Sequence, residues 1–552
     1  MIISSGRMKI RPPVIVLTVA ALTLTGALTA VTRTTLAAAA GNAMAATLVE
    51  DDGADCPVPN PGSPPANSRL PDPFQKLDGT RITSKADWRC RRAEIRELAE
   101  RYVYGDKPAK PASVTGTVSS SSITVNVSDN GRSASFSASV QLPSGTGPFP
   151  AVVVLGGFGA DTATIRAAGA AIINYDPFAV GREGTPRNNK QGAFYSIYGS
   201  SSSTGLLMAW AWGVSRIIDV IEQSGGNILR ADATGVTGCS RYGKGAFVAG
   251  VFDQRIALTM PIESGTGGVP AFRSIATESG SQPLSSAYGE QPWLGDAFGS
   301  YTGNPNALPV DTDEMVAMVA PRGLFIMENP HVDWLGARSG SVAALGGAEV
   351  YKALGAQNNI TYWSDVQDGT HCAARSEWRT PLQQHIQKFL LNTGDVTGVF
   401  RISSRKAGDL AQWRDWQTPT LTDGPSTPPS TPPNTPPTTP PTSAPPTTPP
   451  VTPPPDGACS ASVSLNSWNG GFVATVRVTA GSAPINGWTV GLTLPSGAAI
   501  TNSWNANRSG NSGSVQFTNV SYNGSLPAGG STEFGFQGTG SGTGMTPTCS
   551  AG

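Results

Sequence analysis

The sequence predicts an α/β protein built on a mainly parallel β-sheet, with a small all-β domain at its C-terminal end. Two observations lead to this fold class. Between residues 151 and 391, short apolar runs alternate with helical segments, which is the pattern of buried parallel strands joined by helices. From residue 457 onward, short β-prone runs are broken by Gly, Asn and Ser, and no helical periodicity follows.

The composition restricts the class of protein. The 552 residues exceed one ordinary domain. Lys+Arg and Asp+Glu number 38 each, so no net field attracts nucleic acid or an acidic membrane, and we expect neither as a partner. We expect a monomer. Six cysteines, an even number, fit disulfides formed in an oxidising compartment.

Residues 1–45 have the features of an export signal peptide. Basic residues precede an apolar run over 14–28, and the small-residue site Ala43-Met44-Ala45 follows. The run contains threonine and glycine and is shorter than the roughly 20 apolar residues of a membrane span, which favours cleavage over anchoring. We therefore expect a secreted, extracellular protein. Residues 46–67, rich in Ala, Gly and Pro, are expected to form a flexible N-terminal segment.

Residues 68–415 are expected to form the α/β domain. It opens with a helix over 88–104, for which Ser84 is a candidate N-cap. Alternating polar and apolar residues predict antiparallel strands within 114–142. The predicted parallel strands are 151–155, 170–175, 233–237, 257–262, 323–327 and 360–364. Helices are expected over 206–222, 245–252 and 381–391.

The α/β domain is followed by a linker and a second domain. Residues 424–455 are dominated by Pro, Thr and Ser and carry no charge, so they cannot bury a core and are expected to form an extended linker. Residues 457–552 are expected to form a β-sandwich, whose ends Cys459 and Cys549 would join.

Ser240 lies at a candidate nucleophile elbow, between a β-prone run and a small apolar helix. Glycines tolerate the backbone angles of such a turn, which lifts the serine hydroxyl clear of the sheet. The usual pattern is G-x-S-x-G, but here Tyr242 takes the place of the second glycine and Gly243 follows one residue later. Gly-Cys-Ser also occurs in ordinary tight turns, so this motif alone does not decide between the two.

A serine nucleophile needs a base, which is usually histidine, and the chain contains three histidines. His385 lies in a predicted helix and is expected to be a surface or packing residue. His331 follows Asn329-Pro330 in a loop and remains an alternative. His371 lies in a loop directly after a predicted strand, where the base is expected.

Two cysteines favour His371. Cys239 precedes Ser240, and Cys372 follows His371. The other four cysteines can pair within their own parts of the chain, as Cys56–Cys90 and Cys459–Cys549. A remaining Cys239–Cys372 bond would hold the two Cα atoms about 4.4–6.8 Å apart, and Ser240 and His371 with them. The alternative is two separate buried thiols.

An acid must orient the imidazole and offset the charge that it acquires. The chain order Ser, acid, His matches that of α/β-hydrolases. Glu263 directly follows a predicted strand, at the edge of the sheet where site residues collect. Glu328 and Asp333 follow the next strand, and position alone leaves the choice open.

Three motifs together resemble carbohydrate esterase family 15, the glucuronoyl esterases: Gly238-Cys239-Ser240-Arg241-Tyr242-Gly243-Lys244-Gly245-Ala246, Glu263-Ser264-Gly265 and Thr370-His371-Cys372. The resemblance covers about residues 56–391. It implies an α/β-hydrolase fold, a three-layer sandwich, that cleaves the ester between 4-O-methyl-D-glucuronic acid of glucuronoxylan and lignin alcohols. It implies Ser240 as nucleophile, His371 as base and Glu263 as acid. It also implies that Arg241 serves the oxyanion hole, for which the alternative is a surface ion pair.

The resemblance further implies four substrate-binding residues, Lys244, Gln282, Glu290 and Trp334. Lys244 follows Ser240 by four residues, on the same face of the predicted helix. Each of the four has a simpler explanation as a solvated, loop or core residue. Fungal members of the family carry a cysteine where Ala271 stands, so this chain lacks one of their disulfides.

The C-terminal domain resembles a family 2 carbohydrate-binding module, through Ser467-Trp468-Asn469, Gly487-Trp488-Thr489 and Trp504-Asn505-Ala506. The resemblance implies exposed aromatic residues that stack on sugar rings. Trp468 and Trp504 match two of them, and Tyr522 takes the third place, which is usually tryptophan. Trp488 is expected in the core. Cellulose and xylan both remain candidate ligands.

These observations favour a secreted serine esterase that acts on glucuronoxylan–lignin esters. We expect no cofactor and no metal, because no His/Cys cluster suggests one. One alternative is an acetyl xylan or feruloyl esterase, which would share the triad but would not need to recognise a uronic acid. Another is a polysaccharide-binding protein without catalytic activity, against which only the complete set of Ser, acid and His argues.

Overall fold

The computed structural model describes residues 49–62, 65–423, 459–468, 470–520 and 523–551. The chain divides into two compact units, Met1–Pro429 and Ser430–Gly552. The predicted signal peptide and the predicted linker lie outside the described residues. No helix in the described ranges is both long and apolar enough to span a bilayer.

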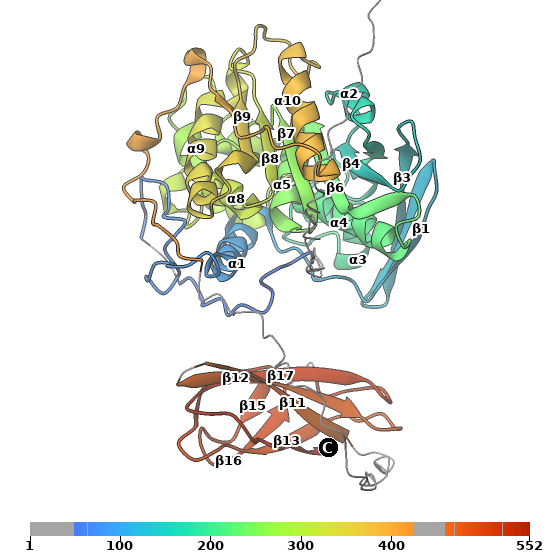
Figure 1. Ribbon diagram of the computed structural model, residues 1–552, viewed down its shortest axis with the longest axis vertical. Coiled ribbons are helices and arrows are strands. Elements are labelled where there is room, and N and C mark those ends of the chain that lie inside the picture. Colours follow the sequence, from blue (N-terminus) through green and yellow to red (C-terminus); the bar gives the residue numbers. More distant parts are fainter. Residues whose placement is uncertain (1–48, 63–64, 424–458, 469, 521–522, 552) are drawn as a thin grey trace, which may run out of the picture. The chain divides into compact units, whose positions relative to one another are not determined.

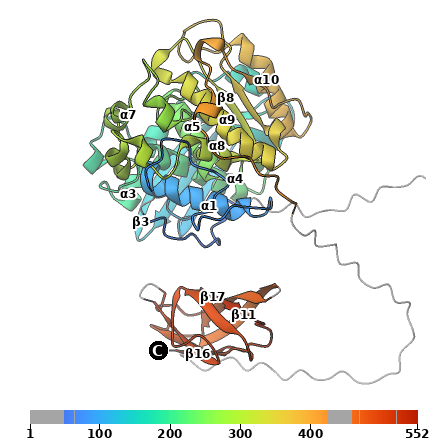
Figure 2. The same ribbon diagram turned by 90° about the vertical axis from the view of Figure 1, so that its left-hand side faces the viewer.

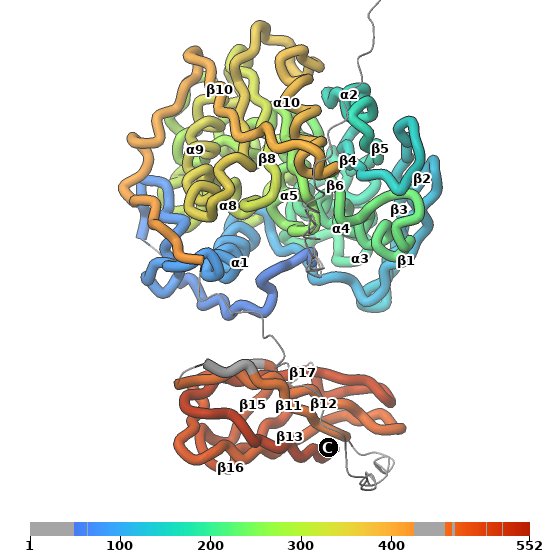
Figure 3. The backbone as a smooth tube through the Cα atoms, in the orientation of Figure 1, coloured from blue at the N-terminus to red at the C-terminus, as the bar shows by residue number. Residues whose placement is uncertain are grey.

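A ten-stranded mixed sheet forms the centre of the first unit (Figure 1). Its first three strands form an antiparallel meander at one edge, and the neighbours from β5 to β10 pair in parallel. Figure 3 shows β1 to β3 at one side of the unit and β10 at the other. In order across the sheet, the strands are β1 (Ser113–Val118), β2 (Ser122–Asp129), β3 (Arg132–Gln141), β5 (Ala171–Tyr175), β4 (Phe149–Leu155), β6 (Leu229–Cys239), β7 (Ile256–Ile262), β8 (Gly323–Met327), β9 (Ile360–Trp363) and β10 (Phe400–Arg401).

Helices cover both faces of this sheet. Neighbouring residues along a strand point to opposite sides, and in the central strand β4 all of them are buried, so both faces must be covered. Val153 and Leu155 join one apolar core, and Val152 and Val154 join another. The first core is completed by α1 (Trp88–Ala99), α3 (Ala193–Tyr198), α4 (Leu206–Gln223), α5 (Arg241–Phe252), α8 (Thr312–Val319) and α9 (Ala337–Ala353). The second is completed by α2 (Thr162–Ala167) and α10 (Ser376–Ile386). The three-layer α/β arrangement is therefore confirmed.

The predicted helix over 88–104 is present, but its start differs from the prediction. Helix α1 begins at Trp88 with Asp87 at the N-cap, and a π-helical turn continues it over Glu100–Tyr104. Ser84 is not the cap. Its hydroxyl accepts a hydrogen bond from the Asp87 N–H, while the Asp87 carboxylate accepts those of Thr83 and Ser84, so this polar turn precedes the helix. Helix α1 lies at the periphery of the unit (Figures 1 and 2).

Contacts of the first unit extend beyond the predicted bounds 68–415. On the N-terminal side, the Glu50 carboxylate pairs with Lys107 at 2.7 Å and with Arg216, and Cys56 is bonded to Cys90. Part of the segment predicted to be flexible, 46–67, thus contacts the domain. On the C-terminal side, Trp416 is buried and donates to the carbonyl of Leu70.

The second unit is all-β, as predicted. Two antiparallel four-stranded sheets enclose a core in which Trp488 stacks on Phe534, with ring centroids 5.2 Å apart. Trp488 is a core residue, as expected, and Cys459–Cys549 joins the ends of the unit. One sheet contains β11 (Cys459–Trp468), β12 (Gly471–Ala480), β17 (Ser531–Thr539) and β14 (Ala499–Trp504). The other contains β15 (Ala506–Arg508), β16 (Ser514–Asn519), β13 (Trp488–Thr493) and β18 (Thr548–Ala551).

Candidate active site

Ser240 lies at a sharp turn between β6 and α5. Its backbone has φ 59° and ψ −126°, a combination that residues other than glycine rarely adopt and that is often found at functional sites. The turn is tight. A Cβ on Gly238 would lie 2.6 Å from the Tyr242 carbonyl oxygen, and one on Gly243 would lie 2.5 Å from that of Ile262. Gly243 therefore meets the steric demand even though it is displaced by one residue from the usual motif.

A disulfide connects this turn to the loop that carries His371. Cys239 is bonded to Cys372, with 5.8 Å between the Cα atoms, and Ser240 and His371 line the same pocket. All three predicted disulfides are present, and the chain has no free cysteine. Because the two sulfurs are oxidised, they are not thiolate ligands, although Glu263 and His371 lie within 4.8 Å of them.

Glu263 lies against the imidazole. Its Oε2 is 2.6 Å from His371 Nδ1 and also accepts the backbone N–H of Cys372 at 2.9 Å. Glu263 is buried, has φ 44°, and directly follows β7. This arrangement leaves His371 Nε2 as the ring nitrogen available to a serine hydroxyl.

The two competing acids lie elsewhere. Asp333 is mostly exposed and pairs with Lys406 at 3.1 Å. Glu328 is fully buried and accepts a long hydrogen bond from Ser264 Oγ at 3.5 Å. Burial, followed by the nearby charge of Glu263, raises the pKa of Glu328 well above its usual range. Neither carboxylate contacts His371 among the described residues.

The other two histidines have different partners. His331 Nε2 is 2.9 Å from the Val366 carbonyl oxygen. His385 packs flat on Phe325, with ring centroids 4.5 Å apart, and its ring nitrogens contact Pro381 and Thr361. Burial lowers the pKa of His385 to about 4. His385 is therefore a packing residue, which is one of the two roles that the sequence predicts for it.

Arg375 is a site residue that sequence reasoning missed. Its guanidinium is 2% exposed, lies 3.5 Å from Glu263 Oε1, and donates to the Thr370 carbonyl at 2.5 Å. It also pairs with the exposed Asp368 at 3.1 Å. Arg375 thus supplies the buried positive charge that a fully buried Glu263 carboxylate needs.

Arg241, the first residue of α5, lines the same pocket as Ser240. Its Nη1 donates to Glu183 Oε2 at 2.7 Å, and Glu183 Oε1 accepts the indole N–H of Trp293 at 2.5 Å. The guanidinium also lies 5.7 Å from the centre of the Trp293 ring. Glu183 and Trp293, which were not predicted as site residues, therefore hold Arg241 beside Ser240.

Lys244 is buried one turn after Ser240. Its ammonium donates to the Ser264 carbonyl at 2.5 Å and lies 5.3 Å from the centre of the Trp293 ring. Burial lowers the pKa of Lys244 to about 8. It is therefore a desolvated donor on the pocket wall, not a solvated surface lysine.

The four predicted substrate-binding residues line one pocket of about 550 Å³ together with Ser240, Arg241 and His371. Gln282 Nε2 donates to Glu290 Oε2 at 2.7 Å, so these two side chains form a pair. Trp334 is 54% exposed, and its ring lies edge-on to that of His371, with centroids 6.0 Å apart. The wall thus offers a cation, an amide, a carboxylate and an indole face, which suits a hydroxyl-rich ring.

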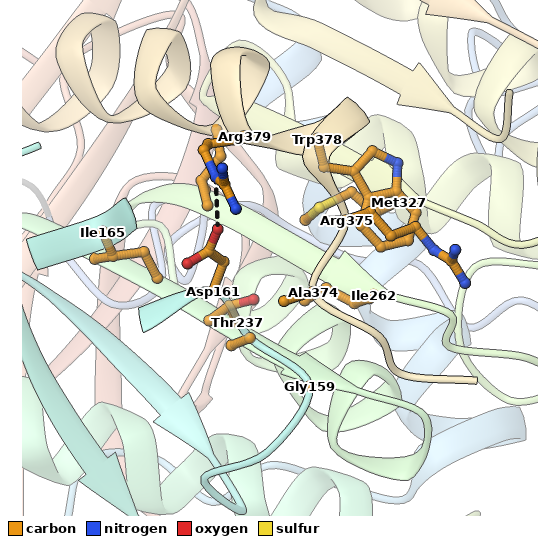
Figure 4. Close-up of a pocket in the computed structure, with 12 residues that line it drawn as sticks. Gly159, Asp161, Ile165, Thr237, Ile262, Met327, Ala374, Arg375, Trp378 and Arg379 are labelled. Atoms are coloured by element: carbon orange, nitrogen blue, oxygen red, sulfur yellow. Dashed lines mark ion pairs between the residues drawn. The ribbon is translucent and has the colours of Figure 1, made fainter. Parts of the chain in front are cut away.

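A second cavity, shown in Figure 4, is too small for a sugar. It lies between the C-terminal ends of β6–β8 and helix α10, with a volume of about 20 Å³. This space holds on the order of one water molecule. Asp161 and Arg379, 3.6 Å apart, form the ion pair drawn in Figure 4.

The predicted sugar-binding aromatics of the second unit are described only by their strands. Trp468 ends β11 and Trp504 ends β14, and both strands belong to one sheet. Their side chains, and Tyr522 as a whole, lie outside the described residues.

Comparison with known proteins identifies relatives of both units. A family model described as "Glucuronyl esterase, fungi" matches residues 125–355, and one described as "Cellulose binding domain" matches residues 459–551. The 4-O-methyl-glucuronoyl methylesterase of Hypocrea jecorina is 39% identical over 362 residues, covering 65% of this chain and 77% of that protein. That of Podospora anserina is 42% identical over 373 residues, covering 65% and 76%.

Solved structures agree with these matches. The glucuronoyl esterase catalytic domain from Hypocrea jecorina has a TM-score of 0.62 at 38% identity, covering 66% of this chain and 100% of that chain. A serine-to-alanine variant of the Sporotrichum thermophile glucuronoyl esterase, in complex with methyl 4-O-methyl-β-D-glucopyranuronate, has a TM-score of 0.62 at 36% identity, with the same coverage.

Proposed function

Because the chain belongs to carbohydrate esterase family 15, the glucuronoyl esterases, and carries a family 2 carbohydrate-binding module, we propose that it cleaves the ester between 4-O-methyl-D-glucuronic acid of glucuronoxylan and an alcohol of lignin. It is a carboxylic ester hydrolase. The observation that carries the proposed substrate is the shared pocket, which Ser240 and His371 line together with Lys244, Gln282 and Glu290.

The proposed reaction is acyl transfer through Ser240. His371 Nε2 takes the proton of the Ser240 hydroxyl, whose oxygen attacks the uronoyl carbonyl carbon. The carbonyl oxygen becomes an oxyanion, which the backbone N–H and the guanidinium of Arg241 stabilise. Glu263, 2.6 Å from His371 Nδ1, offsets the charge of the imidazolium.

Collapse of this intermediate breaks the ester bond. The alcohol leaves with the proton from His371, and the uronoyl group remains on Ser240. Water, deprotonated by His371, then attacks the carbonyl carbon of this acyl-enzyme. The bond to the Ser240 oxygen breaks, His371 returns the proton to that oxygen, and glucuronic acid is released. In the pocket, Lys244 and the Gln282–Glu290 pair bind sugar hydroxyls, and Trp334 contacts the sugar ring.

We also infer where the enzyme acts and as what. Residues 1–45 direct secretion, and the three disulfides form in the oxidising compartment that export reaches. The protein acts as a monomer. The second unit, through Trp468, Trp504 and Tyr522, retains the esterase on cellulose. Xylan binding is the alternative, and retention of the full chain on either insoluble polysaccharide distinguishes them.

Hydrolysis assays test the proposed substrate. The methyl ester of 4-O-methyl-D-glucuronic acid should be hydrolysed, whereas acetylated xylan and methyl ferulate should be poor substrates. Ser240→Ala should abolish turnover. Failure of the wild-type enzyme to cleave the uronate ester, with turnover of acetyl or feruloyl esters, would reject this substrate.

A matched pair of variants tests the acid. Glu263→Gln should lower kcat by about 10²-fold or more, because the amide does not carry the charge that stabilises the imidazolium. Asp333→Asn removes a competing acid that pairs with Lys406 outside the triad, and should change kcat less than about threefold. Equal losses in the two variants would contradict the assignment of Glu263.

A further inference from the structure

Two exposed aromatic side chains contact residues of the candidate active site. Trp334 meets the His371 ring, and Phe158 meets the ring of Tyr242, two residues after Ser240; the mechanism uses only Trp334. Among the described residues, Phe158 and Trp334 are the aromatic members of the exposed large hydrophobic set, at 49% and 54% exposure. Trp334 lines the pocket that also contains Ser240, Lys244, Gln282 and Glu290, which we call the sugar pocket, and Phe158 does not. Exposing an aromatic ring without a partner forgoes the stabilisation that its burial would provide.

Phe158 belongs to a glycine-rich loop that is pressed onto both halves of the catalytic site. A Cβ on Gly156 would come within 2.2 Å of the Tyr242 ring. A Cβ on Gly159 would come within 2.5 Å of Cys239 Cβ and 3.1 Å of Cys372 Cβ. Those two cysteines adjoin Ser240 and His371, so this loop lies against the disulfide that joins them. Gly159 and Thr237, which is near the end of β6, line the same small cavity (Figure 4).

The Phe158 ring packs on other aromatic rings on the side that faces the core. It meets Tyr242 edge-on, with centroids 5.6 Å apart and planes at 82°. Tyr242 in turn contacts Phe178 and the buried Trp210, each at 6.0 Å. The ring therefore rests on an aromatic column that reaches into the core, while almost half of its surface stays open to solvent.

The two sides of Ser240 thus differ in chemistry. The pocket side carries Lys244, Gln282 and Glu290, which suit the acyl part of the substrate. The Phe158 side presents aromatic rings, and the loop beneath it adjoins the segment of His371, from which the leaving alcohol takes its proton. On the proposed function, the uronic acid lies against Lys244, Gln282 and Glu290, so the alcohol half of the ester extends from Ser240 away from these residues.

We propose that Phe158, supported by Tyr242, binds the aromatic ring of the leaving alcohol, so that the enzyme favours esters of aryl-bearing alcohols. A flat ring can stack on the open face of Phe158 or meet it edge-on. Phe158 is then a specificity-determining residue for the alcohol, separate from the residues that select the uronic acid.

The test compares two esters of the same acid, methyl and benzyl 4-O-methyl-D-glucuronate. In the wild type, kcat/KM should be higher for the benzyl ester. Phe158→Ala should lower the ratio of the benzyl to the methyl kcat/KM by about 3- to 10-fold, the range expected for loss of one aromatic contact. Phe158→Trp, which keeps an aromatic face, should retain the ratio.

Several controls separate this proposal from others. Val396→Ala truncates another exposed apolar side chain and should leave the ratio unchanged. Near-UV circular dichroism checks that each variant is folded. A ratio in Phe158→Ala within twofold of the wild-type value would overturn the proposal, even if both esters are cleaved. If the wild type cleaves neither ester, the proposed function fails instead.

Discussion

Removing the Cys239–Cys372 disulfide should affect catalysis far more than its effect on stability would suggest. The bond closes a separation of 133 residues, for which the chain-entropy relation predicts a loss of about 5 kcal/mol when both cysteines are replaced by alanine. For a unit of about 370 residues, this corresponds to a fall in Tm of about 6 °C. The segments that carry Ser240 and His371 would no longer be joined by a covalent bond. A displacement of about 1 Å between these two side chains would lower the rate roughly 10²-fold.

Cys56–Cys90 supplies a matched control. It closes a separation of 34 residues, so replacing both cysteines should cost about 4 kcal/mol, close to the value for the first pair. None of its residues lines the sugar pocket. We therefore expect similar falls in Tm for the two double variants, with kcat reduced about 10²-fold only when Cys239 and Cys372 are replaced.

The assay measures kcat and KM for a uronate ester at a temperature well below both melting points, together with calorimetric Tm values. If the Cys239→Ala/Cys372→Ala variant retains kcat within about threefold of the wild type, the disulfide does not position the triad. Equal losses of kcat in both double variants would show that general destabilisation, and not local geometry, causes the effect.

The remaining predictions concern charges around the site. The KM for the uronate ester should rise as the pH passes about 8, because burial lowers the pKa of Lys244 to about 8 and its ammonium group is deprotonated above that pH. In Lys244→Met, KM should be high and independent of pH between about 7 and 9. Since the folded-state pKa of Lys244 lies below its usual 10.5, the folded form binds fewer protons between these values, and this group makes stability rise with pH there. Arg241→Met should lower kcat by about 10²–10³-fold, as loss of an oxyanion donor does. Glu183→Gln should lower kcat by only about 10-fold, since the guanidinium of Arg241 remains but loses its ion pair. Equal losses of kcat in the two variants, measured by stopped flow, would contradict this order. Arg375→Met should lower kcat by about 10-fold or more with little change in KM, because it leaves the buried Glu263 charge uncompensated; a change in KM alone would place Arg375 in substrate binding.

Local pattern was sufficient to predict the framework of the site. Runs such as 151–155 and 323–327 are apolar on both faces, so their strand character and burial follow from the sequence alone. The cysteines next to Ser240 and His371 predicted a contact between residues far apart in the chain, and the structure contains that bond. Position could not rank Glu263 against Glu328, because both follow strands directly and are fully buried.

The missed residues share a physical reason. Glu183 precedes its partner Arg241 by 58 positions, and Arg375 contacts Glu263 from 112 positions away. The Glu183 side chain is itself mostly buried and pairs with the part-exposed Arg241, whereas Arg375 compensates the buried Glu263 carboxylate; both pairs form only when the chain folds, so no local pattern marks them. One signal was available: a candidate triad acid buried at a strand end needs a nearby cation, and Arg375 is three residues beyond Cys372.

Glu50 connects the N-terminal end of the folded domain to its interior through ion pairs with Lys107 and Arg216. Although burial alone would raise its pKa, the positive charges of Lys107, Arg216 and Arg255 hold that pKa far below the usual range. The predicted signal-peptide cut after residue 45 would keep this carboxylate, whereas loss of a few more residues would remove it from Lys107 and would leave Arg216 with Asp219, 2.7 Å away, as its carboxylate partner. Removal of residues up to and including Glu50 is therefore expected to weaken the packing around α4, which carries Arg216.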